Sequence, residues 1–214
     1  MILVDLICHG TPSPGLFKLH LGYIERMRKS RVVSYAHRPK WNGWGHFESF
    51  TLANGKEERG TPLANSWRDL FYSNKLLRPT CCRCPFTVTD RQGDLTIADF
   101  WGIERSSRPG LKDRLGVSLL LANTDCGVGM VRDAMDAGLL QAWPMTLAEA
   151  MPGNPMLEHP SSYEGDRCDP WETLYGEGYD RMLRKCGFHQ NELSYYAQQA
   201  KRKVKLVLKR ALGR

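Results

Sequence analysis

Residues 81–102 constrain the fold more than any other part of the chain. Three cysteines stand within the four residues 81–84, and ten residues later the segment 94–98 has the composition of a buried strand. That strand runs into Asp99-Phe100-Trp101-Gly102, an acidic and aromatic turn. Soft thiolate ligands followed by such a turn indicate a redox centre beside a planar group.

The cysteine pattern leaves three interpretations open. Cys81 and Cys84 have Cys-x-x-Cys spacing, which lets two thiolates reach one metal from a single turn. Cys8 ends a predicted strand over residues 2–8, where cofactor ligands often lie, and is a candidate third ligand. The N-terminus carries Asp5 and no basic leader, so nothing in the sequence indicates export and an oxidising compartment. The spacing alone allows an iron–sulfur centre, a structural zinc, or buried thiols without a metal.

Periodicity and turn residues predict an α+β or mixed α/β fold, with one central mixed sheet flanked by helices and a C-terminal helical segment. Ser13 and Pro14 form a helix start, and Asn54-Gly55 is a strong hairpin signal. Residues 144–170 read as a loop region with short helical turns. The predicted strands cover 2–8, 31–38, 46–53, 56–61, 94–98 and 116–122, and the predicted helices cover 14–29, 64–76, 125–137, 171–186 and 190–212.

The net charge of +7 is concentrated in the last nineteen residues, which hold seven Lys or Arg and no acid. The rest of the chain is balanced, so we expect no nucleic-acid-binding core. Apolar residues from Val204 to Leu212 follow helical spacing with basic residues between them. Such a helix can pack on its own domain, dock on an acidic protein, or lie on an anionic membrane surface. We expect a cytoplasmic protein, with the inner membrane face as a possible peripheral location.

Four landmarks, in order, resemble one known family. They are residues 5–14, residues 38–44 with Arg38-Pro39-Lys40 and Gly43-Trp44, residues 78–84 with 94–102, and Gly116-Val117-Ser118 with Asn123-Thr124. Over roughly residues 1–160 the chain resembles the C-terminal domain of the beta subunits of coenzyme F-420 hydrogenases and dehydrogenases. Residues 161–214 are then a helical C-terminal extension with the basic tail.

The resemblance implies an iron–sulfur flavoprotein with a four-iron four-sulfur (4Fe-4S) cluster next to FAD. It implies that Cys8, Cys81 and Cys84 are cluster ligands and that Cys82 is not. Other redox subunits, a ferredoxin, or the deazaflavin coenzyme F-420 are the implied electron partners.

This sequence departs from the family pattern at two places. The upstream ferredoxin-type cysteines and a Gly-Thr-Pro-Cys-Gln segment are absent, so the chain is expected to be a fragment or a stand-alone version. The fourth cluster ligand stays open among His9, Cys82 and a partner. Ala98 stands where the family usually has glycine, which matters if a cofactor or backbone approaches closely there.

A flavin site requires an apolar wall and phosphate donors. Phe100 and Trp101 are the expected wall, within the 99–102 turn formed by Asp99 to Gly102. Arg38 and Lys40 are the expected phosphate partners. The turn containing Gly10, Thr11 and Ser13 precedes a helix N-terminus, which favours an anion. The alternatives are core packing for the aromatics and solvated loop charges for the two cations.

Two functions therefore compete. The first is a redox subunit that passes electrons between a 4Fe-4S cluster, FAD, and coenzyme F-420 or a ferredoxin-type partner. The second is a non-catalytic module, stabilised by zinc or free of metal, that binds an acidic partner or membrane through its basic tail. No nucleophile–base pair stands out, and flavin chemistry requires none.

Overall fold

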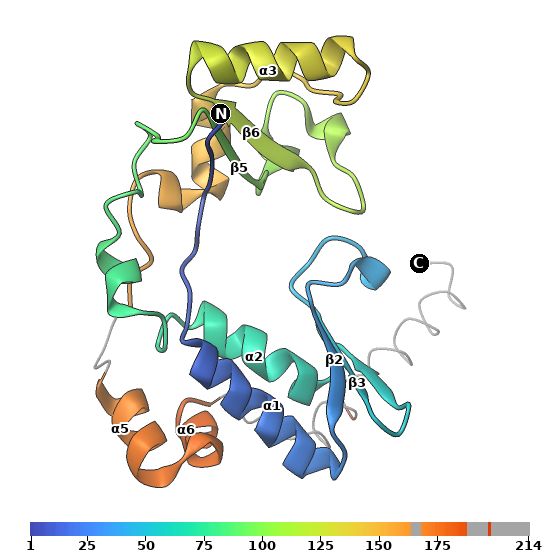
Figure 1. The fold of residues 1–214 in the computed structure, drawn as a ribbon, viewed down its shortest axis with the longest axis vertical. Coiled ribbons are helices and arrows are strands. Elements are labelled where there is room, and N and C mark those ends of the chain that lie inside the picture. Colours follow the sequence, from blue (N-terminus) through green and yellow to red (C-terminus); the bar gives the residue numbers. More distant parts are fainter. Residues whose placement is uncertain (164–167, 188–196, 198–214) are drawn as a thin grey trace, which may run out of the picture. The chain divides into compact units, whose positions relative to one another are not determined.

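The computed structural model describes residues 1–163, 168–187 and 197, and divides the chain into two compact units. Unit 1 contains Met1–Thr11 and Leu77–Ser162, and unit 2 contains Pro12–Leu76 and Tyr163–Arg214. Both units are assembled from two separate stretches of sequence. Figure 1 shows their helices and strands.

Unit 1 is organised around a three-stranded mixed sheet of strand order β1-β5-β6. β1 runs parallel to β5, with Val4 opposite Leu95, and β6 runs antiparallel to β5, with Ala98 opposite Leu119. The strands and α-helices of unit 1 are β1 (Val4–Leu6), β5 (Leu95–Asp99), β6 (Ser118–Ala122), α3 (Asp125–Asp136) and α4 (Leu147–Ala150). Short 3-10 turns complete the unit: η2 (Pro79–Arg83), η3 (Ile103–Arg105), η4 (Pro109–Leu111), η5 (Met151–Gly153) and η6 (Pro155–Leu157).

One face of this sheet carries the core of unit 1. Phe100, Ile103, Leu119 and Ala150 are buried together there, and Ala98 packs against them. The opposite face is partly open, since the side chains of Val4, Leu6 and Ile97 are exposed. Side chains alternate between the two faces of a strand, so Ile97 and Ala98 point to opposite faces and only Ala98 packs against this core.

Asp94 joins the start of β1 to the start of α3. The Leu3 N–H donates to Asp94 Oδ2 at 2.9 Å, and the Thr124 hydroxyl donates to Asp94 Oδ1 at 2.7 Å. Thr124 is also the N-cap of α3, where its hydroxyl accepts from the Gly127 N–H. These hydrogen bonds to the carboxylate hold the pKa of Asp94 below its usual value. Asp94 therefore stays ionised while it ties the first strand to the sheet.

In its described residues, unit 2 combines an antiparallel sheet of strand order β2-β3-β4 with four α-helices. Ser13 caps the first helix by accepting from the Gly15 N–H, and Pro14 is its first residue, as the sequence predicts. The Asn54-Gly55 turn joins β3 to β4, with Gly55 at φ 81°. The elements are α1 (Pro14–Arg28), β2 (Val32–His37), η1 (Lys40–Asn42), β3 (Glu48–Leu52), β4 (Glu57–Arg59), α2 (Pro62–Tyr72), α5 (Cys168–Glu177) and α6 (Tyr179–Lys185).

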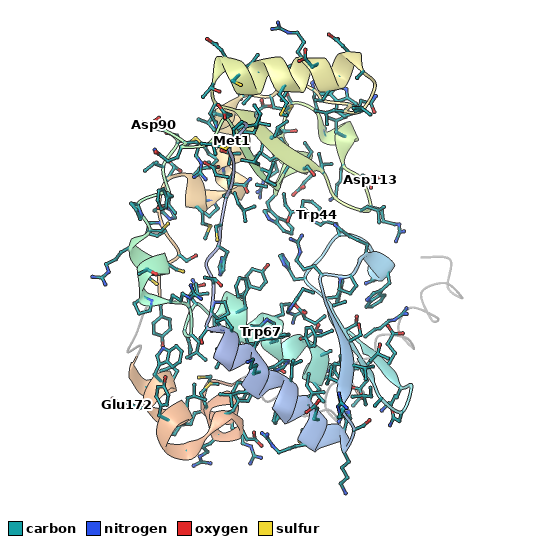
Figure 2. All side chains as sticks on the ribbon, in the orientation of Figure 1. Met1, Trp44, Trp67, Asp90, Asp113 and Glu172 are labelled. Atoms are coloured by element: carbon teal, nitrogen blue, oxygen red, sulfur yellow. The ribbon has the colours of Figure 1, made fainter. Side chains whose placement is uncertain are left out.

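The core of unit 2 encloses a polar residue, His20, which has no exposed surface. Its Nδ1 lies 3.1 Å from the Tyr179 hydroxyl, and its Nε2 lies 3.4 Å from the Tyr35 hydroxyl. The indole of Trp67, labelled in Figure 2, has its centroid 5.4 Å from the imidazole centroid. Burial lowers the pKa of His20 to about 3, because the charged imidazolium is not solvated there.

His20 makes the stability of unit 2 sensitive to acid. Because its folded pKa of about 3 lies below the usual 6.5, its neutral form stabilises the fold above pH 6.5. That contribution decreases as pH falls from 6.5 towards 3, by an amount on the order of 5 kcal/mol in total. In urea unfolding followed by circular dichroism, we expect His20→Gln to be less stable than wild type at pH 7 but to lose much less stability by pH 4.5.

His159, which is exposed in unit 1, provides the matched control. The variant His159→Gln should keep the wild-type pH dependence. An unchanged dependence in His20→Gln would contradict the role assigned to His20.

The α+β class and the C-terminal helical segment are confirmed, although the strands divide between two sheets rather than forming one. The prediction of one helix over residues 171–186 is wrong: α5 and α6 are separated at Gly178, whose φ of 86° interrupts a helix. The helix predicted at 64–76 ends at Tyr72, and Asn74 has φ 62°. The predicted helix 190–212 lies outside the described residues, apart from position 197.

No helix in the described part of the chain combines the length and the apolar character needed to span a bilayer.

Candidate functional site

Cys81 is hydrogen-bonded to the turn that follows Cys8. It lies in η2, and its Sγ accepts a hydrogen bond from the Thr11 N–H at 3.4 Å. The Arg78 N–H donates to the Thr11 carbonyl at 3.0 Å, which closes the contact from the other side. Gly10 permits this approach: it has φ 137°, and a Cβ there would lie 2.8 Å from Leu77 Cδ1. The predicted turn and the predicted cysteine segment therefore meet within unit 1.

The thiols differ in exposure. Cys8 is exposed, whereas Cys81, Cys82 and Cys84 are half-buried. None of the cysteines whose side chains the structure describes forms a disulfide with another. Thiols of intermediate exposure near backbone N–H donors can serve as ligands or redox groups.

These thiols do not form a complete metal site. Across residues 1–163 and 168–187, no three His, Cys, Asp or Glu side chains gather in a way that could hold a metal ion. A 4Fe-4S cluster commonly has four cysteine ligands. The described arrangement thus does not fit such a cluster, and the assignment of Cys8, Cys81 and Cys84 as ligands stays a prediction from the resemblance.

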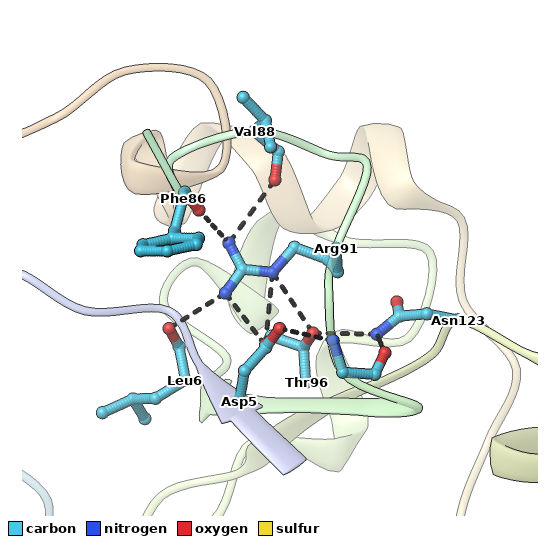
Figure 3. Close-up of polar contacts among 8 residues, drawn as sticks. Asp5, Leu6, Phe86, Val88, Arg91, Thr96 and Asn123 are labelled. Carbon is cyan, nitrogen blue, oxygen red and sulfur yellow. Dashed lines mark hydrogen bonds and ion pairs between the residues drawn. The ribbon is translucent and has the colours of Figure 1, made fainter. Parts of the chain in front are cut away.

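A single guanidinium connects the two cysteine-bearing segments. The side chain of Arg91 is only 3% exposed, and its Nη2 donates to Asp5 Oδ1 at 2.9 Å and to the Leu6 carbonyl at 3.0 Å. Its Nη1 donates to the carbonyl of Phe86 at 2.5 Å (Figure 3). Leu6 lies two residues before Cys8, and Phe86 lies two residues after Cys84. Arg91 therefore fixes the end of β1 against the exit of the cysteine segment.

The carboxylate in this network is itself well satisfied. Asp5 Oδ2 accepts from the Gly93 N–H at 3.0 Å. Burial alone would raise the pKa of Asp5, but hydrogen bonds from Thr96, Arg91 and the Gly93 N–H lower it. Asn123 extends the network by donating to Thr96 Oγ1 at 2.9 Å.

The 99–102 turn follows β5 directly. Asp99 is the last strand residue, and Phe100 is buried in the core of unit 1, in agreement with the alternative that it packs rather than lines a site. Trp101 is half-buried, and Gly102 has φ 87°, a conformation that favours glycine. Of the two predicted wall residues, Trp101 is the more accessible.

Gly153 packs against the backbone of this turn. A Cβ on Gly153 would lie 1.6 Å from the Trp101 carbonyl oxygen, so only glycine fits. Gly153 belongs to η5, which follows α4 directly. The η5 segment thus supports the 99–102 turn from more than fifty residues away in the sequence.

The other predicted residues lie in unit 2. Arg38 has φ 51°, and its N–H donates to the Phe47 carbonyl at 2.8 Å. Lys40 begins η1, and the Ser13 hydroxyl caps α1. Of the predicted residues outside the 99–102 turn, Gly10 and Thr11 lie near Cys81 in unit 1, whereas Arg38, Lys40 and Ser13 belong to unit 2.

Sequence reasoning missed Arg91, Asp5 and Gly153. Arg91 stands in a polar loop with no motif, and its partner Asp5 is 86 residues away. Gly153 stands among prolines and glycines that read only as a loop. A charged residue inside a predicted buried strand, as at Asp5, was the only available signal of a buried ion pair.

Unit 1 is thus a mixed-sheet domain with Cys8 beyond the end of β1 and an aromatic turn at the end of β5. The family model for the C terminus of the coenzyme F420 hydrogenase/dehydrogenase beta subunit matches residues 1–147. The chain belongs to this family. A search of curated proteins found no significant match.

Proposed function

We propose that this chain is a redox subunit that binds FAD and exchanges electrons with coenzyme F-420 or a ferredoxin-type partner. The observation that carries the proposal is the family match over residues 1–147, which includes the 99–102 turn. When bound, a flavin supplies hydride and single-electron transfer by itself. The task left to the protein is to bind the ring, orient it and exclude water.

The residues of unit 1 suit parts of this task. Trp101 offers a half-buried aromatic face, in a turn that Gly102 permits with its φ of 87°. Gly153 packs closely against the Trp101 carbonyl group. No step of the proposal runs through a cluster, because the described thiols do not form a complete cluster site.

Anaerobic purification tests the proposal. We expect flavin to copurify or to bind on reconstitution, giving the absorption of an oxidised flavin that bleaches on reduction. Colourless protein that carries stoichiometric zinc and takes up no flavin would support the non-catalytic module instead.

Cysteine substitution tests the predicted ligands separately. If Cys8, Cys81 and Cys84 bind iron together with a ligand from elsewhere, Cys81→Ser and Cys84→Ser should each abolish iron and sulfide uptake during anaerobic reconstitution. Cys82→Ser is the matched control and should retain both. Equal loss in all three variants would show that the ligand assignment is wrong, and flavin binding would be measured on the same samples.

A further inference from the structure

The loop that follows the 99–102 turn carries a net positive charge, although unit 1 as a whole carries a net negative charge. Unit 1 contains eight Lys or Arg against eleven Asp or Glu. Residues 103–114 nevertheless hold four of those cations and only two acids. The cations are Arg105, Arg108, Lys112 and Arg114, and we call this segment the basic loop. Clustered like charges raise the local potential and attract anions.

The cations of the basic loop are available for binding. All four residues are exposed, and within the described residues none of their side chains has a hydrogen-bond or ion-pair partner. Arg91 in the same unit is the contrast, since its guanidinium is buried and fully engaged. Fixed cations without partners favour an anionic ligand more than cations that are already neutralised.

The loop has a defined shape. Ile103 is fully buried, and Leu111 packs against the same core. The Ser106 hydroxyl donates to the Ile103 carbonyl at 2.7 Å, and the Ser107 N–H donates to Glu149 Oε1 at 2.7 Å. Hydrogen bonds from Ser107 and Thr146 lower the pKa of Glu149 to about 2, so this tether stays ionised. A ligand would meet cations on a pre-formed frame, which lowers the entropy lost on binding.

Arg105 connects the basic loop to the 99–102 turn. A Cβ on Gly102 would lie 2.8 Å from Arg105 Nη2, so the guanidinium lies directly against the glycine. The half-buried Trp101 immediately precedes this glycine in the chain. A planar guanidinium binds two phosphoryl oxygens at once, and an indole can stack on a ring system. The guanidinium of Arg105 thus lies against the residue that follows Trp101.

We propose that Arg105, assisted by Arg108 and Lys112, binds the phosphoryl oxygens of a ring-bearing cofactor at the 99–102 turn. The same chemistry fits the pyrophosphate of FAD and the phosphodiester of a deazaflavin coenzyme. This assigns phosphate binding to unit 1, whereas the sequence pattern favours Arg38 and Lys40 in unit 2. The identity of the ring rests on the proposed function, but the anion site does not.

Titration calorimetry on the full chain tests the site with FAD, coenzyme F-420, riboflavin and inorganic pyrophosphate as probes. For Arg105→Gln we expect the affinity for the phosphate-bearing probe that wild type binds to fall about tenfold or more. Riboflavin has no phosphate, so its affinity should stay within about twofold. Arg105→Lys should recover part of the loss, because it keeps the charge without the planar fork.

Arg132→Gln and Arg38→Gln are the controls. Arg132 is an exposed cation of α3 in the same unit, and Arg38 is the residue expected from sequence. Unchanged FAD, F-420 and pyrophosphate affinities in Arg105→Gln, or an equal loss in Arg38→Gln, would overturn the anion site. If wild type binds pyrophosphate through Arg105 but neither flavin nor deazaflavin, the anion site stands and the proposed function fails. Binding of FAD alone or F-420 alone decides between the two phosphate sources.

Discussion

Gly153→Ala is expected to destabilise unit 1 by about 3 kcal/mol or more, because the new methyl group meets backbone rather than a flexible side chain. Its Cβ would lie 1.6 Å from the Trp101 carbonyl oxygen and 2.4 Å from the carbonyl carbon. Either η5 or the 99–102 turn must move to remove this overlap. For a unit of this size, such a loss lowers the melting temperature by roughly 12 °C or more. Thermal unfolding followed by circular dichroism measures it.

Gly129 in α3 supplies the control for this prediction. A Cβ there meets no atom within 4 Å, so Gly129→Ala should stabilise the helix by up to about 1 kcal/mol. The two alanine variants are therefore expected to shift the melting temperature in opposite directions. A melting temperature of Gly153→Ala within a few degrees of wild type would contradict the described contact between η5 and Trp101.

Arg91→Met should have an effect of similar size. The substitution leaves the Asp5 carboxylate without its ion-pair partner and removes the donors to the Leu6 and Phe86 carbonyls. Breaking a buried pair by removing one partner costs about 3–5 kcal/mol. Because Asp5 keeps the Gly93 N–H and 28% of its side-chain exposure, we expect a value near the lower limit, about 3 kcal/mol, in urea unfolding at pH 7.

Two further variants identify the cause of this loss. Arg83→Met removes an exposed arginine of the same region and should change stability by less than about 0.5 kcal/mol. Asp5→Asn combined with Arg91→Met removes both charges, so the double variant should be more stable than the sum of the single effects predicts. Strictly additive losses would show that Asp5 and Arg91 do not stabilise each other.

The sequence correctly predicted the elements that neighbouring residues determine by themselves. The Ser13-Pro14 helix start requires only neighbouring residues, as does the Asn54-Gly55 hairpin. Gly178 was the exception. It stood inside an apolar pattern that reads as one helix, and its left-handed conformation separates α5 from α6.

The contacts that shape the candidate site depend on long separations in sequence. The residue types in the 99–102 turn and at positions 8 and 81–84 were visible as motifs. The Arg91–Asp5 pair, the fit of Gly153 on Trp101 and the position of Arg105 against Gly102 were not visible. Each contact depends on how the fold brings particular backbone segments together, and neither composition nor periodicity predicts that arrangement.

The interleaving of the two units has a consequence for synthesis on the ribosome. β1 emerges well before β5, with which it pairs, since Val4 lies opposite Leu95. Until β5 is synthesised, β1 has no strand to pair with, and the apolar residues Leu3, Val4 and Leu6 stay unpaired. Residues 12–76 of unit 2 are synthesised during this interval. The core of unit 2 cannot be completed until α6 is synthesised, because His20 and Ile24 of α1 pack with Tyr179 and Met182 of α6. Release of the chain before α6 is made would leave that core open, even though every residue of the matched family region had been synthesised.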